Sequence, residues 1–303
     1  MLKKGFITVG IPVYNELQHI EEALKSVIDQ SYKNYIVIIS DNRSNDGTWE
    51  IIKNYEAKDV RIKAIQHDKN IGLFENWKYA LEQCETEYFM WLGAHDFLGI
   101  DFMKNCLASF EKRNNIVLSF TNTHAVDSKS NILEKSDSNY VDFNDQLDMR
   151  NTNSFIEKWT FIMNKAHSCS AIQGIFKTEF IKKSVFKSLF SLDSLLLFDI
   201  CRYGIIYIDQ NHTDYYRRIN YRPKNNQMKN KTQLYVNNGL VDPDVRNMYY
   251  QLGHEYFKSI VKSDATLSEK IKGFYLIYIK LLYKKKIWNP LSYIFYRKLI
   301  RRN

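Results

Sequence analysis

A histidine and an aspartate, His95 and Asp96, stand directly after an apolar run in the segment FMWLGAHDFL. A second carboxylate, Asp41, ends another apolar run, YIVIIS. Apolar runs of this length are typical of buried strands, and a carboxylate at a strand's end is available as a hydrogen-bond acceptor or ligand. In parallel sheets the carboxyl ends of the strands meet at one edge, where ligands bind. The spacing therefore predicts a polar site at one rim of a sheet.

The elements that must position these residues alternate along the first third of the chain. Strand-like runs and helical patterns follow one another: strands at 6–11, 35–40, 61–67 and 88–94, and helices after Asn15, from about Trp49 and over 73–83. Asn15 is expected to be the N-cap of the first helix. Strands that alternate with crossover helices predict an α/β fold with a parallel, doubly wound sheet. The loops after Ile11, Ser40 and Ala94 should line its rim.

The second half is more irregular. Its polar stretch 136–154 reads as a loop or a hinge, and its expected elements are a helix over 155–164, a strand over 170–176, an apolar helix over 189–204 and a strand over 205–209.

The positive charge lies at the C-terminus. The net charge of the 303 residues is +9, yet residues 270–303 alone carry ten Lys and Arg and no acidic residue, so the rest is nearly neutral. Nucleic-acid binding would need a basic face on the folded body, so no nucleic-acid partner is expected. Pro290 divides the aromatic and basic tail into two helices, which suit either peripheral contact with an anionic membrane or a cap packed on the catalytic domain.

The four isolated cysteines favour a reducing, cytoplasmic setting. Pro12 interrupts the apolar run at the start of the chain, so that run is interpreted as a strand and not as a signal peptide. No window has the length and apolarity of a spanning helix. If the tail binds lipid, the expected place is the cytoplasmic face of the inner or plasma membrane.

Four segments together resemble the signature segments of glycosyltransferase family 2. In order they are IPVYNE (11–16), SDNRSNDGT (40–48), NIGLFENW (70–77) and GAHD (93–96). The resemblance implies a GT-A, Rossmann-like fold: a doubly wound, mostly parallel sheet with helices on both faces, plus a mainly helical, basic C-terminal extension. It implies a catalytic domain over 1–220, with a nucleotide-sugar part (1–125) and an acceptor part (126–220), followed by the helical region 221–303.

The same resemblance implies a nucleotide site. Its residues are Pro12, Val13, Tyr14, Asn15, Glu16, Asp41, Arg43, Gly72, Asn76 and His95. Asp41 would accept a hydrogen bond from the imide N–H of the base, Gly72 would allow close backbone approach, and Asn76 would face the nucleotide. Residues 44–48 form either part of this site or only a capped turn.

GAHD aligns with the two-aspartate metal motif of the family. The alignment implies that Asp96 binds Mn²⁺ or Mg²⁺, although a helix-capping role is the alternative. His95 replaces the first aspartate and is expected to contact a ribose or phosphate oxygen. In the segment TDYYRRIN, Asn220 stands where the family often has a histidine, and Arg217 or Arg218 is expected to meet the diphosphate.

The segment SLDSLLLFDICRYG resembles the one that holds the family's catalytic base. Asp193 is the expected base, and Asp199 is the rival, although Arg202 beside it is an expected ion-pair partner. Five further histidines are interpreted as structural: His67, His124, His167, His212 and His254.

The predicted function is inverting transfer of a sugar from a nucleotide diphosphate sugar, with UDP as the expected nucleotide. The acceptor would be a glycan or lipid-linked saccharide in surface polysaccharide biosynthesis. One alternative is a non-catalytic nucleotide-sugar-binding or scaffolding subunit. Another is a nucleotidyltransferase, a class that usually begins with a glycine-rich basic loop, which IPVYNE does not resemble.

Overall fold

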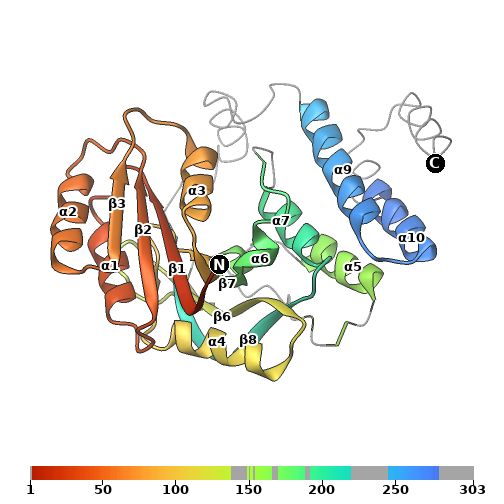
Figure 1. The fold of residues 1–303 in the computed structure, drawn as a ribbon, viewed down its shortest axis with the longest axis horizontal. Coiled ribbons are helices and arrows are strands. Elements are labelled where there is room, and N and C mark those ends of the chain that lie inside the picture. Colours follow the sequence, from red (N-terminus) through yellow and green to blue (C-terminus); the bar gives the residue numbers. More distant parts are fainter. Residues whose placement is uncertain are drawn as a thin grey trace.

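An eight-stranded mixed sheet with helices on both faces forms the body of the protein (Figure 1). The computed structural model describes residues 2–137, 149, 151–152, 154–165, 170–187, 192–219 and 245–279. The strand order is β3-β2-β1-β4-β7-β6-β8-β5. None of the helices in these ranges is long and apolar enough to cross a membrane.

The N-terminal half of the sheet is parallel, as predicted. Its elements are β1 (Lys3–Val13), α1 (Ile20–Ile28), β2 (Tyr35–Asp41), α2 (Thr48–Lys58), β3 (Ile62–Gln66), α3 (Leu73–Glu82) and β4 (Thr86–Trp91). Helices α1 and α2 lie on one side of these strands and α3 on the other (Figure 1). Gly10 allows α3 to pack closely on β1, because a Cβ there would lie 2.8 Å from Ala80 Cβ.

The other half of the sheet is mixed. Its elements are β5 (Phe97–Leu98), α4 (Phe102–Lys112), β6 (Ile116–Val126), α5 (Phe155–Lys165), the 3₁₀ helix η1 (Ser170–Gln173), β7 (Ile175–Lys177), α6 (Thr178–Ile181), α7 (Leu192–Ile200) and β8 (Ile205–Arg218). Strand β7 is antiparallel to both of its neighbours, β4 and β6. Strand β8 runs parallel to β6, and its end pairs with β5, directly after the GAHD segment.

Three local predictions are wrong. Asn15 is not a helix N-cap, because α1 begins at Ile20 and Asn15 has a left-handed backbone with φ 52°. Residues 170–173 form a 3₁₀ helix and not a strand. The strand predicted over 205–209 continues to Arg218, because it pairs along the whole length of β6.

Two helices, α9 (Val245–Lys262) and α10 (Leu267–Ile277), follow the sheet domain. They pack on each other, α9 also on α7 and α10 also on α5. A Cβ at Gly273 would lie 2.9 Å from both Trp159 and Ile260, so one side of α10 is closely packed. The helical prediction is thus confirmed for the described part of this region. Asn220, His167, Cys169 and residues 280–303 lie outside the described residues.

Candidate active site

The loops that follow β1 and β2 are joined by hydrogen bonds at the carboxyl rim of the sheet. The Asn15 N–H donates to Ser44 Oγ (2.9 Å), and Asn15 Oδ1 accepts from the Asn45 N–H (3.0 Å). The Glu16 N–H donates to Thr48 Oγ1 (2.9 Å). The side chain of Asn15 therefore orders this rim instead of capping a helix.

Asp41 organises the second of these loops from a fully buried position. Its Oδ2 accepts hydrogen bonds from the Ser44 N–H (3.1 Å) and from Gln66 Nε2 (2.8 Å), and its Oδ1 accepts one from the Ser44 hydroxyl. A carboxylate has about four acceptor positions, so about one remains. Contact of Asp41 with a base stays a prediction, and it requires a neighbouring side chain to shift so that the base can reach the carboxylate.

Asn76 is also buried at the rim, at the first turns of α3. It accepts from Ser40 Oγ (2.6 Å) and donates to the Val13 carbonyl (3.3 Å), so it joins the ends of β1 and β2. Gly72, with φ 88°, provides the turn that precedes α3. These bonds give Asn76 a positioning role, and its direct contact with a nucleotide stays a prediction.

Other residues of the predicted nucleotide site differ in exposure. Pro12 and Val13 are buried in the end of β1. Tyr14 is 48 % exposed, which leaves its ring accessible for stacking on a base. Arg43 is exposed, has φ 67°, and donates to Gln66 Oε1 (3.3 Å).

The GAHD segment forms a tight turn that fixes the carboxylate of Asp96. The Asp96 N–H donates to the Gly93 carbonyl (2.9 Å). Tyr215 Oη donates to Asp96 Oδ2 (2.8 Å), and the Arg218 N–H donates to Oδ1 (2.9 Å). Helix α4 begins later, at Phe102, so the alternative that Asp96 caps a helix is wrong.

His95 connects this turn to the loop after β1. Its Nδ1 lies 3.1 Å from Glu16 Oε1, and its Nε2 lies 3.9 Å from Asp96 Oδ1. Burial lowers the pKa of His95, but the hydrogen bond to Glu16 and the charge of Asp96 outweigh it and leave the pKa raised. The imidazole therefore has increased cationic character, which suits a contact with an anionic group.

The two arginines at the end of β8 have different roles. The guanidinium of Arg218 is buried and donates to the carbonyls of His95 (2.9 Å) and Asp127 (2.7 Å) and to the Glu22 carboxylate. These bonds hold the GAHD turn in place and occupy the guanidinium of Arg218. Of the two arginines, Arg217 therefore remains the expected contact of the diphosphate. Arg217 is partly exposed, donates to Ser170 Oγ (3.1 Å), and its charge lowers the pKa values of both His95 and Asp193.

The two candidate bases on α7 are clearly distinguished. Asp193, in the first turn, is accessible to solvent but closely surrounded by protein; burial raises its pKa, and the charge of Arg217 opposes that rise. Asp199 is fully buried and accepts from the Val185 N–H (2.9 Å) and from Arg202 Nε (2.8 Å). The predicted Asp199–Arg202 ion pair is therefore present, and of the two carboxylates only that of Asp193 is accessible to solvent.

A divalent metal ion at this site would have to bind Asp96. The described residues contain no group of three or more His, Cys, Asp or Glu side chains that could hold a metal ion. Gly93 leaves the space beside Asp96 Oδ2 open, because a Cβ there would lie 3.0 Å from that oxygen. One fixed carboxylate fits Mn²⁺ or Mg²⁺ when substrate oxygens and water complete the coordination.

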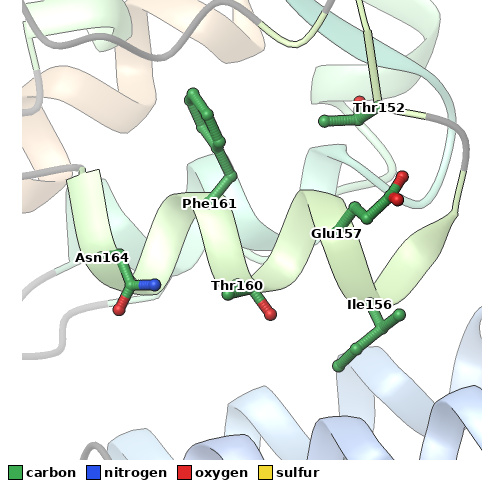
Figure 2. Close-up of a pocket in the computed structure, with 6 residues that line it drawn as sticks. All are labelled: Thr152, Ile156, Glu157, Thr160, Phe161 and Asn164. Carbon is green, nitrogen blue, oxygen red and sulfur yellow. The ribbon is translucent and has the colours of Figure 1, made fainter.

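A separate cavity of about 410 Å³ lies along α5, far along the chain from the rim loops (Figure 2). Its lining residues are Thr152, Ile156, Glu157, Thr160, Phe161 and Asn164. None of the predicted site residues lines this cavity, so it is distinct from the rim site.

Tyr215 is the residue that the sequence reasoning missed. It lies 119 positions after Asp96, and the two meet only because β8 pairs antiparallel with β5, with Phe97 opposite Tyr216. Recognising TDYYRRIN as a strand with alternating faces would have placed Tyr215 and Arg217 on the same side of it.

Comparison with known proteins shows what this chain is similar to. A family model, Glycosyl transferase family 2, matches residues 8–180. The provisionally assigned teichuronic acid biosynthesis glycosyltransferase TuaG of Bacillus subtilis (strain 168) is 33 % identical over 118 residues, 39 % of this chain and 46 % of TuaG. Chondroitin synthase of Escherichia coli is 29 % identical over 128 residues, 42 % of this chain and 18 % of the synthase. The matches thus span about half or less of these relatives.

A solved structure extends the likeness to most of the chain. The crystal structure of S. aureus TarS 1–349 in complex with UDP-GlcNAc has a TM-score of 0.65 at 18 % identity and covers 88 % of this chain and 70 % of that one. The architecture is therefore that of a GT-A fold.

Proposed function

The chain belongs to glycosyl transferase family 2, and from that premise we propose that it is an inverting enzyme that uses a nucleotide diphosphate sugar. The observation that carries the proposal is the fixed carboxylate of Asp96 beside His95. The charge of Arg217 acts on both His95 and Asp193, so these charged groups are close enough to interact. Retention of both Asp96 and Asp193 argues against a non-catalytic subunit. The segment IPVYNE also differs from the glycine-rich basic loop that is usual in nucleotidyltransferases.

The rim loops are proposed to bind the nucleotide, with Tyr14 against the base and Asp41 behind it. The complexes of TarS with UDP and UDP-GlcNAc support a uridine nucleotide as the first candidate. His95 and Arg217 would then contact the diphosphate, because Arg217 carries a positive charge close to His95 and the raised pKa of His95 favours its charged form.

A divalent cation held by Asp96 would stabilise the negative charge that develops on the leaving diphosphate. The protein's own contribution is to fix that carboxylate. The two hydrogen bonds from Tyr215 and the Arg218 N–H orient it before substrate binds, which reduces the reorganisation that binding requires.

Asp193 is proposed to be the general base. The acceptor hydroxyl oxygen forms a bond to the anomeric carbon while the bond from that carbon to the diphosphate oxygen breaks, and the hydroxyl proton moves to the Asp193 carboxylate. The diphosphate leaves with the electron pair of the broken bond. The raised pKa of Asp193 suits this task, because it makes the carboxylate a stronger proton acceptor.

The acceptor is proposed to be a growing surface polysaccharide or a lipid-linked saccharide. The names of the relatives TuaG and chondroitin synthase refer to such polymers. A lipid-linked acceptor would benefit from an enzyme held at the membrane surface.

Helix α10 is proposed to provide that contact with an anionic bilayer. Leu267, Ile271 and Tyr275, which are 76 %, 57 % and 64 % exposed, form an apolar stripe with a spacing of four residues on the side opposite the packed Gly273. Lys272 lies next to this stripe, and residues 270–303 carry ten basic and no acidic residues. An exposed apolar stripe with basic neighbours suits an anionic lipid surface.

The proposed function is tested by calorimetry with UDP and Mn²⁺ and by release of UDP from UDP-sugars. Wild-type protein should bind UDP and hydrolyse or transfer a UDP-sugar slowly. Asp96→Asn should lose the Mn²⁺-dependent part of UDP affinity, because the amide has no charge to offer the cation. If wild-type protein binds no nucleotide, or if Asp96→Asn binds UDP and Mn²⁺ unchanged, the assignment of this site is wrong.

A further inference from the structure

The side-chain carbonyl oxygen of Gln173, the last residue of η1, is buried without a hydrogen-bond partner in the described part of the chain. The residue is 7 % exposed, and its carbonyl oxygen Oε1 has no partner among the described residues. Gln30 makes the contrast clear: it is also buried, but its amide donates to the carbonyls of Ser26 and Gly99 and accepts from the Met103 N–H. Buried polar groups are nearly always paired, so an unpaired one requires an explanation.

Helix η1 lies beside the strand that leads into the GAHD turn. Strand β7 follows η1 and pairs antiparallel with β4, with Lys177 opposite Tyr88 and Phe176 opposite Phe89. Helix η1 itself packs against β4, β6 and α7.

A hydrogen bond links η1 to the charged residues of the site. Ser170, the first residue of η1, accepts from Arg217 Nη1 (3.1 Å), and the charge of Arg217 acts on both His95 and Asp193. Helix η1 therefore contacts both the arginine expected to meet the diphosphate and the helix that holds the proposed base. The donor sugar must lie near both groups, because its anomeric carbon is bonded to the diphosphate and attacked by the acceptor.

We propose that Gln173 binds the donor sugar, its amide oxygen accepting a hydrogen bond from an O–H or N–H group of the sugar. This inference rests on the proposed function. The buried acceptor is satisfied when the correct sugar is bound and stays unpaired when a sugar lacks the donor group. A site built in this way discriminates strongly between sugars, because the wrong one leaves a desolvated polar group without a partner.

The test is Gln173→Met, which keeps the length and removes the amide, with Gln30→Met as the matched control. Calorimetry with wild type first selects the tightest of UDP-GlcNAc, UDP-glucose and UDP-galactose. Gln173→Met should weaken the binding of that nucleotide sugar by about 3- to 10-fold, which is the contribution of one hydrogen bond. The affinity for UDP should change by less than about 2-fold. A loss of affinity for UDP-GlcNAc alone identifies the acetamido N–H as the donor to Gln173. A loss of affinity for the other sugars identifies a hydroxyl as the donor.

Thermal unfolding provides the second readout. Gln173→Met should lower the melting temperature less than Gln30→Met does, because Oε1 of Gln173 has no hydrogen bond to lose among the described residues, whereas Gln30→Met breaks three bonds. Equal effects on UDP and on the nucleotide sugar, or no effect on either, would overturn the inference. A lowered melting temperature without a selective loss of sugar affinity would overturn it as well. If wild type binds neither UDP nor any nucleotide sugar, the proposed function itself fails and the inference fails with it.

Discussion

Replacing Asp193 and Asp199 separately with asparagine should produce two different defects, although the two residues lie on one short helix. Asp193→Asn keeps the volume of an accessible side chain and removes its ability to accept a proton. General acid–base catalysis contributes about 10²–10⁴-fold, so kcat should fall by about that factor. The affinity for the nucleotide sugar and the free energy of unfolding should stay near those of the wild type.

Asp199→Asn should instead destabilise the fold. Asp199 is fully buried, and its partner Arg202 is only 9 % exposed, so the substitution leaves a buried guanidinium without its counter-charge. Breaking a buried ion pair from one side typically costs about 3–5 kcal/mol. Asparagine can still accept one hydrogen bond, from either the Val185 N–H or Arg202, so we expect the lower end of this range.

The assay combines urea unfolding with single-turnover transfer or donor hydrolysis at saturating nucleotide sugar. A clear result is a stable but slow Asp193→Asn and an unstable Asp199→Asn whose folded fraction turns over normally. The reasoning is refuted if folded Asp199→Asn is inactive while Asp193→Asn is fully active. The base would then have to be sought elsewhere on the acceptor side.

Three further predictions concern residues that the structure connects to the site. Tyr215→Phe should weaken Mn²⁺-dependent UDP binding by about 10–100-fold, as loss of an orienting partner typically does, whereas Tyr207→Phe on the same strand should not. Arg217→Gln should shift the acidic limb of the kcat–pH profile to higher pH, because its charge holds the pKa of Asp193 down and a base acts only when deprotonated; an unshifted limb contradicts this. Ile271→Glu should reduce sedimentation with phosphatidylglycerol vesicles by about 10-fold or more, while the control Val60→Glu, at a 96 % exposed position, should have no effect. Equal sedimentation of both variants would exclude α10 as the contact.

The sequence was most informative where function depends on neighbouring residues. The parallel half of the sheet followed from alternating strand and helix patterns, because each βα unit is local and its periodicity is visible in a short window. The rim followed for the same reason, since residues just after parallel strands gather at one edge. Asp199 and Arg202 are three positions apart on one helix, so their ion pair could also be predicted.

Tertiary structure decided what depends on pairing between distant segments. Asn15 appeared to be a helix cap, yet its bonds to residues of the next loop make it a link between loops, because tertiary contacts outweighed local propensity. Residues 170–176 resemble one strand in the sequence, but residues 170–173 form a 3₁₀ helix and only the residues after them join the sheet.

By itself, then, the sequence determined the family, the α/β class and the identity of the rim residues, because these reside in short motifs and local periodicity. Only the tertiary structure decided how those residues are used. It assigned Arg218 to the interior and left Arg217 partly exposed, fixed Asp96 with Tyr215 from 119 positions away, and left the buried carbonyl oxygen of Gln173 without a hydrogen-bond partner among the residues that the structure describes. The physical reason is that hydrogen bonds and burial depend on distances in space, and in this sheet the closest neighbours of the site come from strands that are remote in the chain.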